Sequence, residues 1–370
     1  MALDLVLYTD EHREAAARFN QRYLAADPKP LFVLGDPPAD NLDPPGAPVE
    51  RRHYVLSDGD EVRGGIIIQR QDFLVNGRVL RVGNAQSPLA EGIFDKKHAQ
   101  SGMVLVRKMM QLDPLMYGVG MGGLDRPFPR MLKVLKWRLE PVPFFFRVVR
   151  PVRFLTELSM LRSSPLRRAA SSIAAWSGAG FAGIHLAQTA RNRVALNGVS
   201  TEAVSEWGPW ADEIWAAVAN GPGYAFAAVR TAEVLKSFVS LAPGSRITAC
   251  RVLSEGRITG WAALMVRQMQ DHAMFGNLRL GTVLDVMARP GHEERVAAAA
   301  SAHFARAGTA DLLVTNQWQP AWRHAFERSG YFRGPSKYIL GFSHELLAAI
   351  GDDWSRVHVT RADGDGRANL

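Results

Sequence analysis

The sequence has few of the features that mark disulfide-bonded, secreted or metal-binding proteins. Its 370 residues include one cysteine, Cys250, so the chain forms no intramolecular disulfide. It opens without the apolar stretch that a signal peptide needs. The ten histidines show no metal-ligand spacing. These absences favour a cytoplasmic protein, and we predict no metal cofactor.

Several well-known catalytic and binding motifs are also missing. The sequence has no Walker-type phosphate loop and no G-x-S-x-G nucleophile motif. No motif near Cys250 would activate its thiol. No module combining aromatic and basic residues for nucleic acid is found, so we expect no specific nucleic-acid partner.

The composition is that of a soluble globular protein with room for two domains. Hydrophobic residues make up 47% of the chain and charged residues 22%. The formal net charge is +8, which favours acidic partners such as nucleotide-bearing cofactors, acidic carrier proteins, nucleic acid or anionic lipid headgroups.

The most informative stretch is 79–123, which reads as strand, polar turn, helix, strand and glycine-rich exit. Before it, Asp58-Gly59 and Asn76-Gly77 join three predicted strands into an antiparallel meander. A helix is predicted over about 95–112 and a strand over 116–120. That strand must run parallel to its predecessor because a helix separates them.

The second half repeats this order. It has a hairpin turning at Glu255-Gly256, a strand over 278–287, a helix over 293–307 that Gly308 ends, and a strand over 311–315. Strands over 144–149 and 337–342 are predicted to close the first and second sheets. We therefore predict an N-terminal domain over 1–150, a C-terminal domain over 198–345 and a tail over 346–370.

Residues 151–197 are interpreted as a helical connector between the domains. No charged residue occurs from Ser171 to Ala190, and arginines flank this run. Its serine, glycine, histidine and glutamine residues make it too polar for a typical membrane-spanning helix. Association with a membrane surface remains the alternative, although a connector is favoured, and the predicted location is cytoplasmic or membrane-peripheral.

The element order of both halves resembles the GNAT acyltransferase superfamily. The segment NQWQPAWRHAFERSGYFRGPSKYILGF (316–342) is similar to that family's late helix and following strand. In the first half, QSPLAEGIFD (86–95) and GMGG (120–123) resemble a bacterial group of tandem GNAT proteins associated with polysaccharide or cell-envelope loci. The resemblance implies an α/β fold of two tandem domains. Each would have a mixed, mostly antiparallel sheet, a central pair of splayed parallel strands and flanking helices.

The resemblance also implies an acyltransferase whose acyl-CoA or acyl carrier protein thioester lies between the splayed strands, with its pyrophosphate at the start of the following helix. The family's pyrophosphate loop is missing from both halves. The N-terminal loop reads Ala90-Glu91-Gly92, and Arg289 to Glu293 is only a partial match. Two alternatives follow. One is a tRNA-dependent aminoacyltransferase of the FemABX type, and the other is a non-catalytic GNAT pair that serves as a binding or scaffold subunit.

Two carboxylates are the candidate catalytic bases. Glu91 lies in the polar turn at the end of a predicted strand, where it could deprotonate an amine or hydroxyl acceptor. Asp285 lies inside the apolar strand VLDVM, where a carboxylate is unfavourable unless it is paired or catalytic. Arg230 and Arg279 are its expected partners. The acceptor is expected to be a small molecule or a glycan.

Further candidates for binding the donor or the acceptor lie at predicted strand ends. They are Asn84, Gln86, Ser87, Gly92, Gly120, Gly122, Gly123, Asn316 and Trp318. Amide side chains would hold substrate by hydrogen bonds, and glycines would let a ligand approach the backbone closely. In the tail, Asp363 and Asp365 are predicted either to bind a cation, to fold back on a site or to belong to a disordered end.

Overall fold

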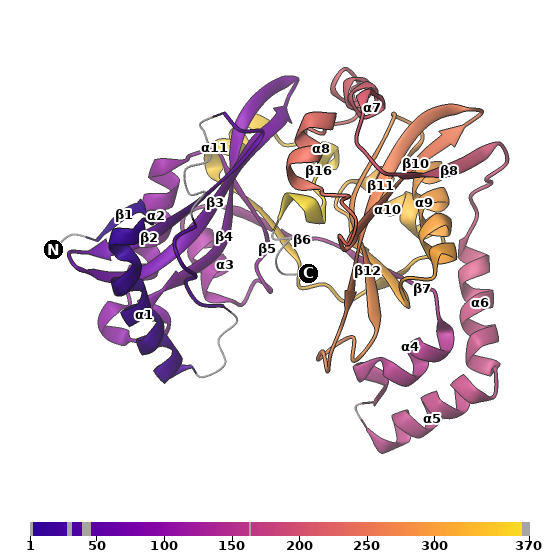
Figure 1. The fold of residues 1–370 in the computed structure, drawn as a ribbon, viewed down its shortest axis with the longest axis horizontal. Helices are drawn as coiled ribbons and strands as arrows, with labels where there is room; N and C mark the ends of the chain where they lie inside the picture. The colour runs from indigo at the N-terminus through magenta and orange to yellow at the C-terminus, as the bar shows by residue number, and fades with distance from the viewer. Residues whose placement is uncertain (1–2, 28–31, 39–45, 163, 365–370) are drawn as a thin grey trace. The chain divides into compact units, whose positions relative to one another are not determined.

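The structure is a computed structural model that describes residues 3–27, 32–38, 46–162 and 164–364. The chain divides into two compact units (Figure 1). Unit 1 comprises Met1–Pro141 and Lys337–Asp353, and unit 2 comprises Val142–Ser336 and Trp354–Leu370. The predicted candidate Asp365 lies outside the described residues.

Unit 1 is built on one mixed sheet. Its strands have the order β1-β2-β3-β4-β5-β15-β6, and β4 and β5 pair in parallel. Its main elements are β1 (Asp4–Leu7), α1 (Arg13–Ala26), β2 (Val49–Asp58), β3 (Glu61–Val75), β4 (Arg78–Ala90), α2 (Ser101–Leu112), β5 (Met116–Gly120), α3 (Pro127–Val134), β6 (Arg138–Pro141), β15 (Ile339–Phe342) and α11 (His344–Ile350). The strand predicted over 116–120 is confirmed with its bounds.

Unit 2 has a sheet of the order β14-β7-β13-β12-β11-β10-β8, in which β12 and β13 are parallel. The strands of this sheet are β7 (Phe144–Val148), β8 (Val199–Val204), β10 (Ile247–Ser254), β11 (Arg257–Gln268), β12 (Arg279–Ala288), β13 (Leu312–Asn316) and β14 (Phe332–Gly334). Two short strands of unit 2, β9 (Phe226–Ala228) and β16 (Val357–His358), are not part of this sheet and pair in parallel with each other. Its helices are α4 (Pro151–Glu157), α5 (Pro165–Trp176), α6 (Ala179–Arg191), α7 (Pro209–Ala219), α8 (Ala232–Phe238), α9 (Glu293–Ala307) and α10 (Pro320–Arg328).

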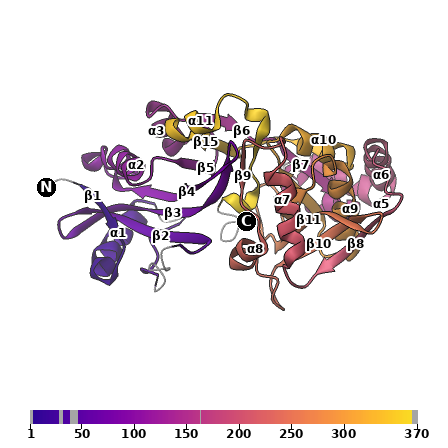
Figure 2. The same cartoon turned by 90° about the horizontal axis from the view of Figure 1, so that it is seen from above.

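Helices cover both faces of each sheet. In unit 1, α1 buries Phe19 against Val55 on one face, and α2 buries Val106 and Met109 against Ile68 on the other (Figure 2). In unit 2, α9 and α10 cover one face, and α7 packs against β11 and β12. The fold is therefore mixed α/β with two mixed sheets, as predicted.

The tight turns follow from their sequences. Asn76 and Gly77, between β3 and β4, have φ values of 46° and 78°. Glu255 and Gly256, between β10 and β11, have φ values of 51° and 77°. Two successive positive φ angles match the twist of a two-residue hairpin and are most easily adopted by Asn-Gly-like pairs. These two predicted hairpins are confirmed, and so is the third, since β2 and β3 pair antiparallel around Asp58-Gly59.

Two strands join the sheet of the other half of the sequence. β7 pairs with β13 and β14 in unit 2, and β15 pairs with β5 and β6 in unit 1. The predicted contiguous domains, with limits at residues 150 and 345, therefore do not coincide with the two units. The physical reason is that β7 and β15 make the same kind of pairing, each antiparallel to the second strand of a parallel pair, so their own sequences do not distinguish the two sheets.

Candidate functional site

The parallel strands of unit 1 separate at the point where the resemblance places the donor. β4 and β5 pair only at Gly83 with Met116 and at Asn84 with Tyr117. Beyond Asn84, β4 has a register shift. Gln86 lies opposite Ile67 and Leu89 lies opposite Gly65, so three residue steps in β4 match two in β3. A bulge of this kind bends the strand away from its neighbour and redirects its side chains. Ser87 lies at this bulge with a φ of 47°.

Buried polar side chains gather on one face of the sheet beside this separation. Gln69 of β3 lies directly opposite Asn84, and Asn84 is paired with Tyr117 of β5. The Gln86 amide donates to Gln69 Oε1 at 3.4 Å, and the Gln71 amide donates to the Tyr117 hydroxyl at 3.4 Å. The Asn84 amide donates to the Tyr117 carbonyl oxygen at 3.5 Å. The predicted residues Asn84 and Gln86 thus belong to one group of neighbouring polar side chains, called the amide cluster below.

His53 shares this face, because it lies opposite Ile67, which lies opposite Gln86. Burial, together with nearby Arg51, lowers the pKa of His53 to about 4, so its imidazole is neutral near pH 7. The sequence-based reasoning missed His53, Gln69 and Gln71. The spacing of two between Gln69 and Gln71 within a strand is the signal that could have revealed their common face.

The glycine-rich exit of β5 is a turn with an unusual backbone. Gly120, Met121, Gly122 and Gly123 have φ values of 92°, 55°, 72° and 119°. Only glycine adopts such angles without strain, so backbone conformation alone accounts for three glycines here. The turn also places backbone N–H groups at the carboxyl end of β5, where ligands commonly bind in parallel sheets.

Glu91 is placed in a buried ion-pair network. Its side chain is 2% exposed, and its two oxygens accept from Arg22 Nε at 2.7 Å and Arg63 Nη1 at 3.0 Å. A carboxylate held by two guanidinium groups is stabilised as an anion and has no free oxygen directed at a substrate. Gly92 is also engaged, since its N–H donates to Ser101 Oγ at 2.9 Å.

Glu91, Asp95 and His98 place one ligand atom each within 4.8 Å of one another. Because two arginines already neutralise Glu91, a cation there would have to displace them. We therefore assign no metal to this group.

Unit 2 repeats the separation of parallel strands. β12 and β13 pair from Leu280 with Leu312 to Thr282 with Val314. A register shift follows in β12. Val283 lies opposite Leu264 of β11 and Asp285 lies opposite Ala263, so β12 has one extra residue between them. In both units, therefore, the first strand of the parallel pair, β4 or β12, has a bulge directly after the residues that pair in parallel.

Asp285 is buried and paired, as predicted, with Arg230. The Arg230 Nε donates to Asp285 at 2.6 Å, and its Nη2 donates to Asp363 from the C-terminal segment. The Thr360 hydroxyl donates to Asp285 at 3.0 Å. Burial and the neighbouring Asp363 carboxylate raise the pKa of Asp285, against the lowering effect of Arg230. Of the three possibilities considered for Asp363, folding back onto another part of the chain is the one observed.

Arg279 was the other expected partner of Asp285, and this expectation is wrong. Its Nη2 donates to Asp311 at 2.8 Å, and its backbone N–H donates to the same carboxylate at 2.9 Å. Asp285 follows a bulge six residues further along β12, so the two side chains serve different clusters.

The C-terminal segment Trp354–Asp363 occupies the gap between β12 and β13. On the β12 side, His358 Nε2 lies 3.1 Å from the Val286 carbonyl oxygen, to which it donates. On the β13 side, the Arg361 guanidinium donates to Asn316 Oδ1 at 2.7 Å, and Trp318 Nε1 donates to the Trp354 carbonyl at 2.8 Å. The predicted ligand-binding residues Asn316 and Trp318 therefore hold the chain's own segment.

The loop before α9 is likewise engaged. The Glu293 carboxylate accepts hydrogen bonds from the backbone N–H groups of Gly291 and Glu293, and burial raises its pKa. These N–H groups belong to the loop that the resemblance assigns to pyrophosphate. A carboxylate of the protein thus takes the place of an anionic ligand there.

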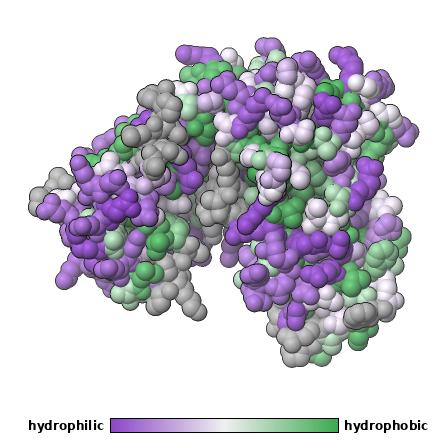
Figure 3. Space-filling model, in the orientation of Figure 1, coloured by the Kyte–Doolittle hydropathy of each residue, from purple (hydrophilic) through white to green (hydrophobic). Residues whose placement is uncertain are grey.

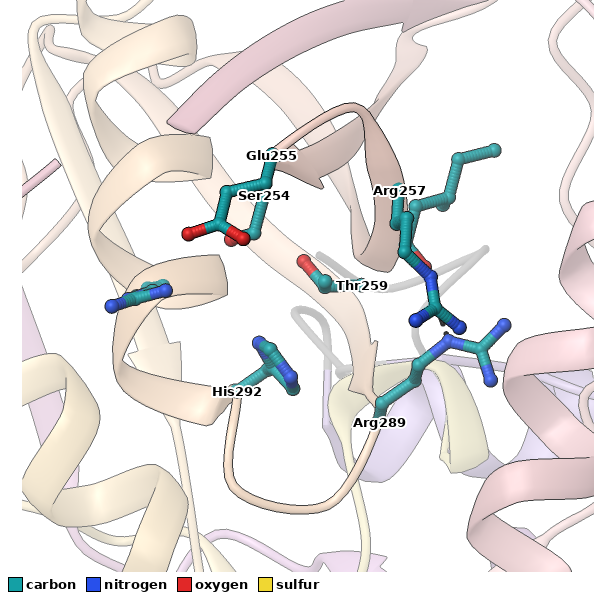
Figure 4. A pocket seen from close by; sticks show the side chains of 8 residues that line it. Ser254, Glu255, Arg257, Thr259, Arg289 and His292 are labelled. Carbon is teal, nitrogen blue, oxygen red and sulfur yellow. Dashed lines mark hydrogen bonds between the residues drawn. The ribbon is translucent and has the colours of Figure 1, made fainter. Parts of the chain in front are cut away.

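A cavity of about 250 Å³ lies beside the same loop (Figure 4). Arg257, Arg289 and Arg295 contribute to its lining, and the buried Ser254 Oγ and His292 Nδ1 have no hydrogen-bond partner among the described residues. The cavity is formed by the β10–β11 hairpin and the loop after β12, so it does not lie between β12 and β13.

The His358 contact predicts a measurable pH dependence. Burial and Arg230 lower the pKa of His358 to about 4, against the raising effects of Asp363 and the Val286 carbonyl. Because this pKa is lower in the folded protein than the unfolded value of about 6.5, protons bind more readily to the unfolded chain. The fold therefore loses stability as the pH falls below about 6.5. We expect His358→Gln to gain about 2 kcal/mol relative to the parent protein between about pH 7 and about pH 5.

This prediction is checked by thermal and urea unfolding of both proteins at the two pH values. Asp285 has the opposite linkage, because its raised pKa favours the fold at low pH, but it is present in both proteins and cancels in the comparison. A constant stability difference between the two proteins across this pH range would contradict the assignment.

Sequence comparison alone identifies no relative, since no protein-family model and no curated protein matches the chain. Solved structures do match. A GCN5-related N-acetyltransferase from Anabaena variabilis has a TM-score of 0.52 at 8% identity, over 92% of this chain and 72% of that one.

Two further structures match over 92% of this chain. A protein of unknown function from Enterococcus faecalis, described as a probable N-acyltransferase, has a TM-score of 0.48 at 9% identity over 72% of its own chain. A tandem GNAT protein from the clavulanic acid biosynthesis pathway has a TM-score of 0.45 at 13% identity over 99% of its own chain.

The fold assignment rests on the first of these matches together with the geometry above. Each unit has an antiparallel meander, a crossover helix and a parallel pair with a bulge in its first strand, which agrees with the mixed sheets, splayed parallel strands and flanking helices that the resemblance implied. The protein has a GNAT-like acyltransferase fold. It contains two copies of that fold in tandem, with their last strands exchanged.

Proposed function

We propose that the protein is an acyltransferase that binds an acyl thioester donor in unit 1 and transfers the acyl group to an amine or hydroxyl acceptor. The observation that carries this proposal concerns unit 2, where the position that corresponds to the donor site of unit 1 is already filled by the protein itself. Trp354–Asp363 fills the gap between β12 and β13, and Glu293 engages the loop N–H groups beside it. Of the two bulged parallel pairs, the β4–β5 pair is then the one assigned to the donor.

The transfer is a single exchange at the thioester carbonyl. The acceptor nitrogen or oxygen attacks the carbonyl carbon, the new C–N or C–O bond forms, and the C–S bond breaks. The acceptor proton ends on the thiolate, which leaves as a thiol. Backbone N–H groups near the bulge of β4 and the turn after β5 stabilise the oxyanion, and His53, which is neutral near pH 7, relays the proton.

The amide cluster supplies the polar lining. Asn84 and Gln86 lie where β4 leaves β5, and they orient the acceptor through hydrogen bonds. Glu91, predicted as a base, is assigned a positioning role instead, because Arg22 and Arg63 hold both of its oxygens. Asp285 is assigned to anchoring the C-terminal segment.

The first experiment identifies the donor and its unit. The full chain is titrated with acetyl-CoA, a long-chain acyl-CoA and acyl carrier protein while its melting temperature is recorded. A donor present at a hundred times its Kd should stabilise the native state by about 2.7 kcal/mol. Hydrogen exchange with the stabilising donor should then show protection at 85–90 and 118–123 rather than at 283–288.

Matched variants test the amide cluster. Gln86→Leu keeps the side-chain volume but removes a buried hydrogen-bonding amide, so we expect transfer to fall about tenfold. Gln317→Leu makes the same change at a buried glutamine of unit 2 and should leave transfer unchanged. Protection by the donor in unit 2 would overturn the assignment to unit 1. The absence of a shift with every donor would favour the scaffold alternative.

A further inference from the structure

Large apolar side chains are exposed on the two helices of the α5–α6 hairpin, defined here as Pro165–Arg191. The exposed fractions are 85% for Leu166, 68% for Ile173, 50% for Phe181 and 68% for Leu186. Leu166 and Ile173 are seven residues apart and therefore share one face of α5. Figure 3 shows apolar (green) side chains on this part of the surface, where Figure 1 places α6.

Every charge in the surrounding sequence is positive. From Leu158 to Thr201 there is no aspartate or glutamate, whereas arginine occurs at 162, 167, 168, 191 and 193. Arg162, Arg191 and Arg193 are exposed. Glu157, which lies 3.7 Å from Arg162, ends this stretch on one side. Along the sequence, the charged side chains that flank the exposed apolar residues are therefore all cations.

The hairpin is held in a defined orientation. The Gln188 side chain of α6 accepts from the Val148 N–H at 2.7 Å and donates to the Val148 carbonyl at 3.1 Å, and Ile184 packs into the core beneath β7. A Cβ on Gly180 would come within 2.4 Å of Leu155 and 2.8 Å of the Ala174 carbonyl, so α6 packs closely on α4 and α5. Ile184 and Gln188 face inward, which leaves Leu186 on the outer side.

We infer that the α5–α6 hairpin binds the surface of an anionic lipid bilayer, with Leu166, Ile173, Phe181 and Leu186 entering the headgroup region and the arginines contacting lipid phosphates. None of the described helices is long and apolar enough to cross a membrane, so binding is at the surface. Helices with an apolar face and basic flanks bind in this way. A second copy of the same surface is a poorer occupant, since it would bring arginines together.

The test is flotation of the full chain with vesicles. Binding to phosphatidylcholine vesicles that contain phosphatidylglycerol should be much stronger than to phosphatidylcholine alone and should weaken as salt is added. Leu166→Gln, Ile173→Gln and Leu186→Gln should each reduce the partition coefficient about tenfold. Arg191→Gln and Arg193→Gln should each reduce it about fivefold.

Val134→Gln is the matched control, because Val134 of α3 is 70% exposed and lies outside the hairpin. This variant should leave vesicle binding unchanged. Because all the substituted side chains are exposed, every variant should have the melting temperature of the parent protein. Failure to bind anionic vesicles would overturn the inference. So would an equal loss in Val134→Gln, or equally tight binding to duplex DNA as a soluble polyanion. Donor binding is measured without vesicles, so this test and that of the acyltransferase proposal fail independently.

Discussion

Replacing Arg230 with methionine should destabilise unit 2 by about 3–5 kcal/mol, because two buried carboxylates would lose their shared cation. Arg230 is 1% exposed, as are Asp285 and Asp363. Methionine preserves most of the apolar stem but none of the donors. The two carboxylates would then have to take up protons or reach water, and releasing the C-terminal segment is the available route. Urea unfolding measures the loss of stability.

Hydrogen exchange at residues 354–363 measures release of the segment, which should exchange faster in Arg230→Met than in the parent protein. Arg279→Met is the matched control. Its partner Asp311 also lies 3.7 Å from Arg150 and 3.5 Å from Arg153, so that carboxylate keeps cationic neighbours. If Arg230→Met were as stable as the control, with unchanged exchange, the anchoring role would be refuted.

Glu91→Gln should destabilise unit 1 by about 2–3 kcal/mol while each folded molecule keeps its turnover. The substitution leaves Arg22 and Arg63 without a buried anion. The effect should fall below that of a fully buried pair because these arginine side chains are 34% and 18% exposed. Stability is measured by urea unfolding, and turnover is measured per folded molecule with the donor identified by thermal shift.

Glu61→Gln provides the comparison, because Glu61 also pairs with Arg22 but is 33% exposed. The Glu61→Gln protein should lose less stability than the Glu91→Gln protein. Loss of turnover in a stable Glu91→Gln protein would restore Glu91 as the catalytic base that its position in the sequence suggested. Gln86→Leu, which affects the amide cluster and not the ion pairs, separates the two explanations.

Local structure was largely predictable because it depends on neighbouring residues. The Asn76-Gly77 turn, the helix over 293–307 with its end at Gly308, and the strand at 116–120 all follow from backbone preferences and hydrophobic spacing within a few residues. The pairing of Asp285 with Arg230 was also predictable in kind, because a carboxylate inside an apolar strand needs a cation.

Long-range choices were not predictable from the same information. Arg279 lies on the same strand as Asp285, yet it pairs with Asp311, because a bulge at the intervening position sets which way each side chain points. Asn316 and Trp318 at the end of β13 were predicted to bind a ligand, but they contact Arg361 and Trp354 of the C-terminal segment, which is distant in sequence.

The sequence by itself determined two similar α/β units, their hairpins and the carboxylates that need partners, because periodicity and turn chemistry act over short distances. Only the tertiary structure decided that β7 and β15 are exchanged, that Glu91 lies between two arginines and that the C-terminal segment fills one donor position. Several partners were sterically and electrostatically acceptable in each case. The choice among them depended on packing of the whole chain, to which residues far apart in the sequence contribute.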